Sequence, residues 1–194
     1  MLLFLSNIPW MIFNIFLALI GMVLGFILLK IPSGYLRVFT YFVWLLFIPN
    51  TIYLVTDLAH LSWELPQVSG IWSILIILQF ILLAIIGVVT YMVSMISFER
   101  TLHKKIRKAS ERLTLLIIGT INILIGVGII LGRVYRIHSW HVFTQTGRVI
   151  ASFVDFSISP LLILLSFFMG IVIFVVYMLL RDGVLRYVER KQIL

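Results

Sequence analysis

Two short stretches of the sequence carry polar residues at spacings that could form a binding site. In "IPNTIYLVTDLAHL" (48–61) and the residues just after it, polar side chains recur every three or four positions, along one side of a helix: Asn50, Tyr53, Asp57, His60 and Glu64. In "LGRVYRIHSWHVF" (131–143), Arg133, Arg136 and Trp140 share a face if the helix continues through them. Arginine binds carboxylate or phosphate oxygens through paired N–H groups, so the two stretches together suggest an anion site.

The composition indicates whether water or lipid surrounds these residues. Of the 194 residues, 62% are hydrophobic and only 11% are charged, and the mean hydropathy is +1.20. No water-soluble fold could bury so much apolar surface, so the sequence predicts an integral membrane protein. The absence of cysteine excludes disulfides and thiolate metal ligands.

Five segments with no more than one charged residue each are long enough to cross a hydrocarbon core, which takes roughly 20 helical residues. They predict an all-α transmembrane bundle in a single domain (1–194), with spans at about 8–29, 36–56, 71–98, 113–131 and 160–180. Alternation of apolar and polar residues is absent, which argues against barrel strands. The pattern at 141–155 predicts a short helix lying in the membrane interface.

The distribution of positive charge predicts the orientation of the bundle. Twelve of the 15 Lys and Arg residues fall in connections that alternation places on one side, and three fall on the other. Because short cytoplasmic connections retain positive charge, we expect the N-terminus outside and the C-terminus inside. Arg133, Arg136 and Arg148 then lie outside against this bias, which suggests a function or a carboxylate partner for them.

Some residues near the middle of the spans predict local structure. Pro49 lacks a backbone donor, so the second span should bend there and free the carbonyl of Leu45. Asn14, Gln79 and Asn122 suggest interhelical hydrogen bonds. The GxxxG spacings at 21–25 and 128–132 favour close packing within the chain over dimerisation.

The strings "PNTIYLVTDLAHL" (49–61) and "LGRVYRIHSW" (131–140) resemble an uncharacterised bacterial family of integral membrane proteins, domain of unknown function 1361. Members carry a Pro-Asn, Tyr, Thr-Asp, His-Leu string on one helix and a Gly-Arg, Arg, Asn-Ser-Trp-Asp string on another. Here His138 replaces the Asn and His141 replaces the Asp. The resemblance implies a multi-pass protein of the bacterial cytoplasmic membrane and no particular activity.

Three hypotheses compete for this site. In the first, Asp57 pairs with Arg133 or Arg136 and the array only holds helices together, as in a structural or accessory subunit. In the second, the site faces outward and binds an anionic or phosphate-bearing ligand, such as a lipid head group or a lipid-linked precursor. In the third, a metal-assisted hydrolase or transferase acts on a phosphate-containing lipid, with four possible metal ligands: Asp57, His60, His138 and His141.

The binding hypothesis is our main prediction, and whether the chain is an enzyme stays open. Its candidate ligand-binding residues are Asn50, Tyr53, Asp57, His60, Arg133, Arg136, Ser139 and Trp140. No catalytic residue can be assigned, no cofactor is expected, and no metal is expected outside the enzyme hypothesis. The expected partners are membrane lipids; a partner membrane protein or a homo-oligomer stays open, and no nucleic acid is expected.

Overall fold

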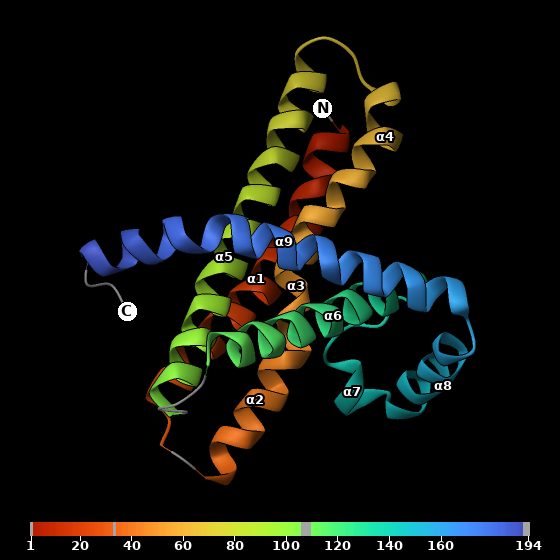
Figure 1. Ribbon diagram of the computed structural model, residues 1–194. Helices are drawn as coiled ribbons and strands as arrows, with labels where there is room; N and C mark the ends of the chain where they lie inside the picture. The colour runs from red at the N-terminus through yellow and green to blue at the C-terminus, as the bar shows by residue number, and fades with distance from the viewer. Residues whose placement is uncertain (1, 33, 106–109, 192–194) are drawn as a thin grey trace.

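The computed structural model describes residues 2–32, 34–105 and 110–191, and this part of the chain is helical with no strand. Four long helices and one interrupted helix account for most of it (Figure 1). The long helices are α1 (Leu2–Lys30), α5 (Ile71–Lys105), α6 (Glu111–Tyr135) and α9 (Pro160–Lys191). The interrupted helix consists of α2 (Tyr35–Phe47), α3 (Pro49–Thr56), the 3-10 turn η1 (Asp57–His60), α4 (Leu61–Glu64) and the 3-10 turn η2 (Leu65–Gln67).

Five of these units are long and apolar enough to cross a membrane, which confirms the predicted number of spans. Large apolar side chains are exposed around the bundle, including Leu116, Phe168 and Leu179. In a water-soluble protein such a surface would be unstable, whereas in a bilayer it faces lipid. The predicted placement of the N-terminus outside stays a prediction.

The helices form two groups. The interrupted helix packs with α1 and α5, and α6 packs along α9. Figure 1 shows α6 and α9 crossing the three-helix group obliquely, and contacts between α3 and α6 and between α5 and α9 join the groups. The start of α1 lies near the turn that precedes α5, and the segments between α6 and α9 project on another side.

Pro49 interrupts the second span, as predicted. α2 ends at Phe47 and α3 begins at Pro49, with Ile48 bonded back to the carbonyl of Trp44. Carbonyl groups just before the break accept side-chain hydrogen bonds: that of Leu46 from Ser139, and that of Phe47 from Asn50. The break therefore ties the second span to the segment after α6.

Glycines allow the closest helix contacts. Gly21 and Gly25 lie against α2–α3 and α5, and Gly128 and Gly132 lie against Pro49 and Tyr53 of α3. Both GxxxG spacings thus serve packing within the chain, as predicted. The contact between α6 and α9 depends on a further glycine, Gly126, which lies directly against the backbone of α9.

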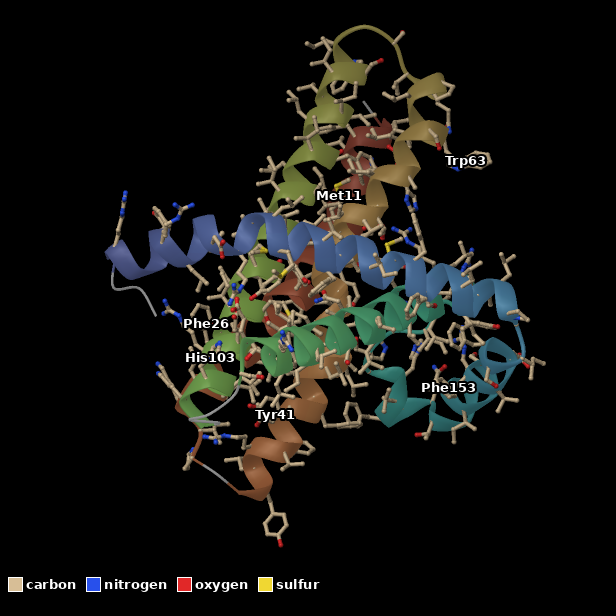
Figure 2. The ribbon with its side chains drawn as sticks, viewed as in Figure 1. Met11, Phe26, Tyr41, Trp63, His103 and Phe153 are labelled. Atoms are coloured by element: carbon tan, nitrogen blue, oxygen red, sulfur yellow. The ribbon has the colours of Figure 1, made fainter. Side chains whose placement is uncertain are left out.

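The predicted interfacial helix is two helices in the structure. α7 (His141–Thr144) and α8 (Thr146–Ser157) replace the single segment expected at 141–155. Ser152 and Phe156 are buried against the bundle, while Ile150, Phe153 and Val154 are exposed. Figure 2 shows Phe153 on α8, beside the bundle, and Trp63 projecting from α4. An apolar face turned away from the protein suits a helix in contact with lipid.

The substitution Gly126→Ala should weaken the pairing of α6 with α9. An added Cβ would overlap the carbonyl oxygen of Ser166 and lie 2.8 Å from the backbone nitrogen of Gly170. Backbone atoms cannot yield as a flexible side chain can, so we expect a loss of about 1–3 kcal/mol in the free energy of unfolding. Titration with a denaturing detergent, followed by tryptophan fluorescence, measures this loss.

Gly119→Ala is the matched control on the same helix. A Cβ at residue 119 meets only a side-chain carbon of Phe174, at 3.9 Å, so this variant should be as stable as the parent or slightly more stable. Equal destabilisation by the two variants would contradict the close contact at Gly126.

Candidate functional site

An ion pair between Asp57 and Arg133 joins the two polar stretches. Nη2 of Arg133 lies 2.6 Å from Oδ1 of Asp57, and also donates to Oγ1 of Thr56 at 2.8 Å. The amide of Asn14 on α1 donates to Oδ2 of Asp57 at 3.2 Å. The Asp57 side chain is 3% exposed and that of Arg133 is 26% exposed. One carboxylate therefore links α1, the end of α3 and α6.

The ring of Tyr53 lies beneath the same arginine. The guanidinium carbon of Arg133 is 4.3 Å from the ring centre, which is within the range of a cation–π interaction. A Cβ at Gly132 would lie 2.9 Å from Cε2 of Tyr53, so the glycine provides the space for the ring. Within the described residues, the Tyr53 hydroxyl makes no hydrogen bond.

Asn50 and Ser139 meet at the break in the second span. Nδ2 of Asn50 donates to Oγ of Ser139 at 2.9 Å, and Ser139 donates to the carbonyl of Leu46 at 2.6 Å. These bonds satisfy groups that would otherwise be unpaired in an apolar environment. Both residues therefore have a structural role, and the Oδ1 atom of Asn50 stays available as an acceptor.

His60 and Glu64 face α1, as Asp57 does through its hydrogen bond with Asn14. Glu64 accepts from Asn7 at 2.7 Å, and the exposed ring of His60 lies 5.8 Å from that of Trp10. Asp57, His60 and Glu64 thus keep one line along α1, whereas Asn50 bonds Ser139 after α6. The backbone tightens into a 3-10 turn at Asp57. A 3-10 turn has three residues per turn and rotates the following side chains relative to α-helical spacing.

Helix α6 does not continue to Trp140, although Arg133, Arg136 and Trp140 would share a face only if it did. It ends at Tyr135, and Arg136 adopts a left-handed conformation with φ 54°. This residue redirects the chain, so Arg136 and Trp140 do not share a helical face with Arg133. Arg136 is exposed, and its side chain makes no hydrogen bond or ion pair with any described residue.

Trp140 is packed between other aromatic groups. The His138 ring stacks on it at 4.4 Å with an interplanar angle of 4°, and Phe13 of α1 meets it edge-on at 5.4 Å. The backbone N–H of His138 donates to Nδ1 of His141 at 3.2 Å. Trp140 therefore anchors the segment after α6 to α1, and one of its faces is already covered.

The structure does not assemble the four metal ligands of the enzyme hypothesis. His138 and His141 lie near each other, with ring centres 5.2 Å apart, but His60 packs against Trp10. Across the described ranges, no three His, Asp or Glu side chains come together in a group that could hold a metal ion.

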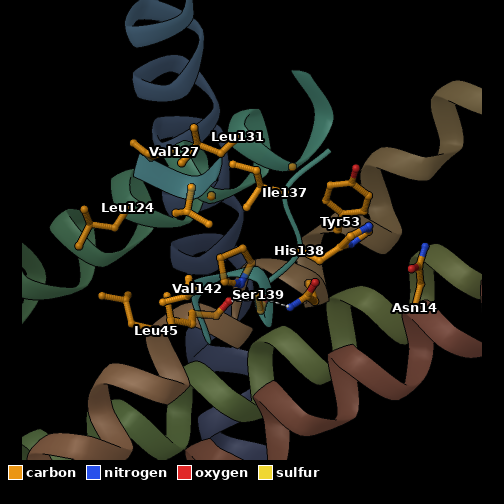
Figure 3. Close-up of a pocket in the computed structure, with 16 residues that line it drawn as sticks. Asn14, Leu45, Tyr53, Leu124, Val127, Leu131, Ile137, His138, Ser139 and Val142 are labelled. Carbon is orange, nitrogen blue, oxygen red and sulfur yellow. Dashed lines mark hydrogen bonds between the residues drawn. The ribbon is translucent and has the colours of Figure 1, made fainter. Parts of the chain in front are cut away.

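A cavity of about 240 Å³ lies between α2–α3, α6 and the segment 137–149 (Figure 3). Three of the predicted ligand-binding residues line it, namely Asn50, Tyr53 and Ser139, together with Asn14 and His138. Figure 3 shows Tyr53, His138 and Asn14 toward one end, and Leu45 and Leu124 toward the other. The cavity thus has a polar end and an apolar end. The remaining five candidates do not line it: Asp57, His60, Arg133, Arg136 and Trp140.

A second buried carboxylate joins α5 to α9. Glu99, 2% exposed, accepts hydrogen bonds from Tyr177 and Arg181 and lies 3.5 Å from the imidazole of His103. The predicted span at about 71–98 ends just before Glu99, and this cluster was not predicted. Spacing offered little signal, because Glu99 and Arg181 are 82 positions apart. The mid-span polar residues behave as predicted: Asn14 bonds Asp57, Gln79 contacts Asn7, and Asn122 bonds Tyr91.

Five apolar helices joined by buried polar pairs are the architecture of a multi-pass helical membrane protein. Residues 13–176 match the family described as "Protein of unknown function (DUF1361)". The match covers most of the chain and includes both polar stretches, so the protein belongs to that family, as the resemblance indicated. No curated protein and no solved structure matches the chain.

The substitution Asp57→Asn should destabilise the fold because it leaves Arg133 without its counter-charge. Breaking a buried pair costs about 3–5 kcal/mol, and the partial exposure of Arg133 should reduce this loss to about 2–3 kcal/mol. Detergent unfolding measures it. Asp155→Asn is the control, since Asp155 is exposed, and should change stability by less than about 0.5 kcal/mol. Equal stability of the Asp57 variant and the parent would show that the pair contributes nothing.

His138 should make the stability of the protein sensitive to acid. Partial burial, together with the nearby charges of His141 and Arg148, lowers the pKa of His138 from its ordinary value of 6.5. The fold therefore favours the neutral ring. This contribution is fully present above pH 6.5 and is lost as the pH falls through the lowered pKa.

Unfolding measured between pH 8 and pH 5 tests this dependence. His138→Phe keeps a ring against Trp140 but cannot become charged, so it should lose less stability on acidification than the parent. An identical acid response in the two proteins would contradict a lowered pKa at His138.

Proposed function

We propose that the protein binds an anionic or phosphate-bearing lipid, or a lipid-linked precursor, in the cavity between α2–α3, α6 and the segment 137–149. The observation that carries the proposal is the two-ended character of this cavity, with predicted site residues at its polar end and an exposed arginine next to it in the chain. A lipid has the same two-ended character.

Arg136 is the best candidate for contact with a phosphate group. It directly precedes Ile137 and His138, which line the cavity, and no described residue neutralises its charge. Arg133 is less suited, because its Nη2 group already donates hydrogen bonds to Asp57 and Thr56. An unpaired guanidinium offers an anion its hydrogen bonds without first breaking an existing pair.

The apolar end suits a hydrocarbon chain. Leu124 lies nine residues before Arg133 on α6, a separation of about 13 Å along the helix axis at 1.5 Å per residue. A lipid with its phosphate near Arg136 would extend its chain toward Leu45, Leu124 and Val127, in the direction of the membrane centre. On the predicted orientation, the phosphate would lie at the outer surface.

The structural hypothesis has its own supporting observation, the direct contact of Asp57 with Arg133. This contact explains part of the polar array but not the cavity beside it. A structural pair and a lipid site can therefore share these helices, with Tyr53 between them. The enzyme hypothesis gains no support from the arrangement of the histidines.

Binding of phosphatidylglycerol to the purified protein in detergent tests the proposal. Native mass spectrometry should show retention of phosphatidylglycerol in preference to phosphatidylcholine, whose head group has no net charge. Arg136→Gln should weaken this retention about tenfold, as expected for loss of a charge-assisted hydrogen bond. Arg112→Gln removes the same charge from an exposed position at the opposite end of α6, far from the cavity lining, and should change retention little.

Filling the cavity provides a second arm of the same test. Leu131→Trp places a bulky ring in the cavity and should abolish retention, whereas Leu116→Trp, on an exposed face of α6, should not. If Arg136→Gln and Leu131→Trp both retain phosphatidylglycerol as well as the parent does, the proposed function is overturned.

A further inference from the structure

The geometry points to a glycerophospholipid as the ligand, with its ester carbonyls held by Tyr53 and His138. This inference rests on the proposed function and narrows its ligand class. It excludes, in particular, lipids whose phosphate is attached directly to a hydrocarbon chain, such as polyprenyl phosphates.

Two hydrogen-bond donors lie in the cavity without a partner. The Tyr53 hydroxyl and the His138 imidazole both line it, and neither side chain makes a hydrogen bond to any described residue. A neutral imidazole carries one N–H donor and a phenol carries one O–H donor. Hydrocarbon placed against two such groups would exclude water and leave both unsatisfied, which costs free energy.

In the proposed complex, these two donors lie beside the part of the ligand between its hydrocarbon chain and its phosphate. Leu45 and Leu124 mark the apolar end, and Arg136 directly precedes the cavity residues Ile137 and His138 in the chain. Figure 3 shows Tyr53 and His138 on the side of the cavity opposite Leu45 and Leu124. A ligand in this site therefore needs hydrogen-bond acceptors between its hydrocarbon chain and its phosphate.

A glycerophospholipid has this order of groups. Its acyl chains end in ester carbonyls, which accept hydrogen bonds but cannot donate them, and the phosphate follows on the glycerol. A polyprenyl phosphate has no acceptor between chain and phosphate. The free Oδ1 atoms of Asn14 and Asn50, which also line the cavity, can accept from a hydroxyl group of the ligand or from water.

The test compares dioleoyl phosphatidylglycerol with its ether-linked analogue, which keeps the chains and the charge but lacks both carbonyls. The parent protein should bind the ester form about three- to tenfold more tightly, as expected for one or two hydrogen bonds. Tyr53→Phe keeps the ring beneath Arg133 and removes only the hydroxyl, so it should reduce this preference. Tyr135→Phe, a tyrosine outside the cavity lining, should leave the preference unchanged.

The outcomes separate this inference from the proposed function. Equal binding of the ester, the ether and a polyprenyl phosphate, with Arg136→Gln still weakening all three, would overturn the glycerophospholipid assignment alone. An ester preference that Tyr53→Phe leaves intact, also after His138→Phe, would overturn it as well. Failure of every phosphate-bearing lipid to bind would overturn the proposed function itself.

Discussion

The half of the described structure that holds the candidate site depends on the solvation of one buried carboxylate, Asp57. Asp57 is 3% exposed in a chain whose surroundings are largely hydrocarbon, where an unpaired charge is very costly. Its oxygens are satisfied by Arg133 from α6 and by Asn14 from α1. Three helices must therefore approach each other at this point, and the position of Tyr53 and the wall of the cavity follow from that approach.

The second buried carboxylate, Glu99, likewise joins helices near the other end of the bundle. Asp57 and Glu99 both belong to the three-helix group, and their arginine partners belong to the pair formed by α6 and α9. Each ion pair thus fastens one helix of one group to one helix of the other. Between the two ion pairs, Gly128 and Gly132 bring α6 close to α3. Ionic and steric contacts together fix how the two groups cross, and neither alone would specify the crossing.

The sequence predicted those features that depend on local pattern and on the solvent. Hydropathy predicts the five spans, Pro49 predicts the break, and the polar spacings predict that Asp57 pairs with Arg133 or Arg136, of which Arg133 is the partner in the structure. Other features depend on tertiary contacts that leave no local pattern. The left-handed Arg136 ends α6 where a helix was expected to continue, and a 3-10 turn interrupts the second span at Asp57. Neither departure breaks a propensity rule strongly enough to be seen in the sequence.

The cavity itself follows from the way the break at Pro49 is satisfied. The break at Ile48 leaves nearby carbonyls in need of partners, and Ser139 and Asn50 supply them. To reach Leu46, the chain after α6 must fold back beside the second span instead of extending away from it. The segment 137–149 thereby becomes a wall, and the space between it, α3 and α6 is left open. The hydrogen bonds of Ser139 with Leu46 and Asn50 therefore hold one wall of the cavity against the second span.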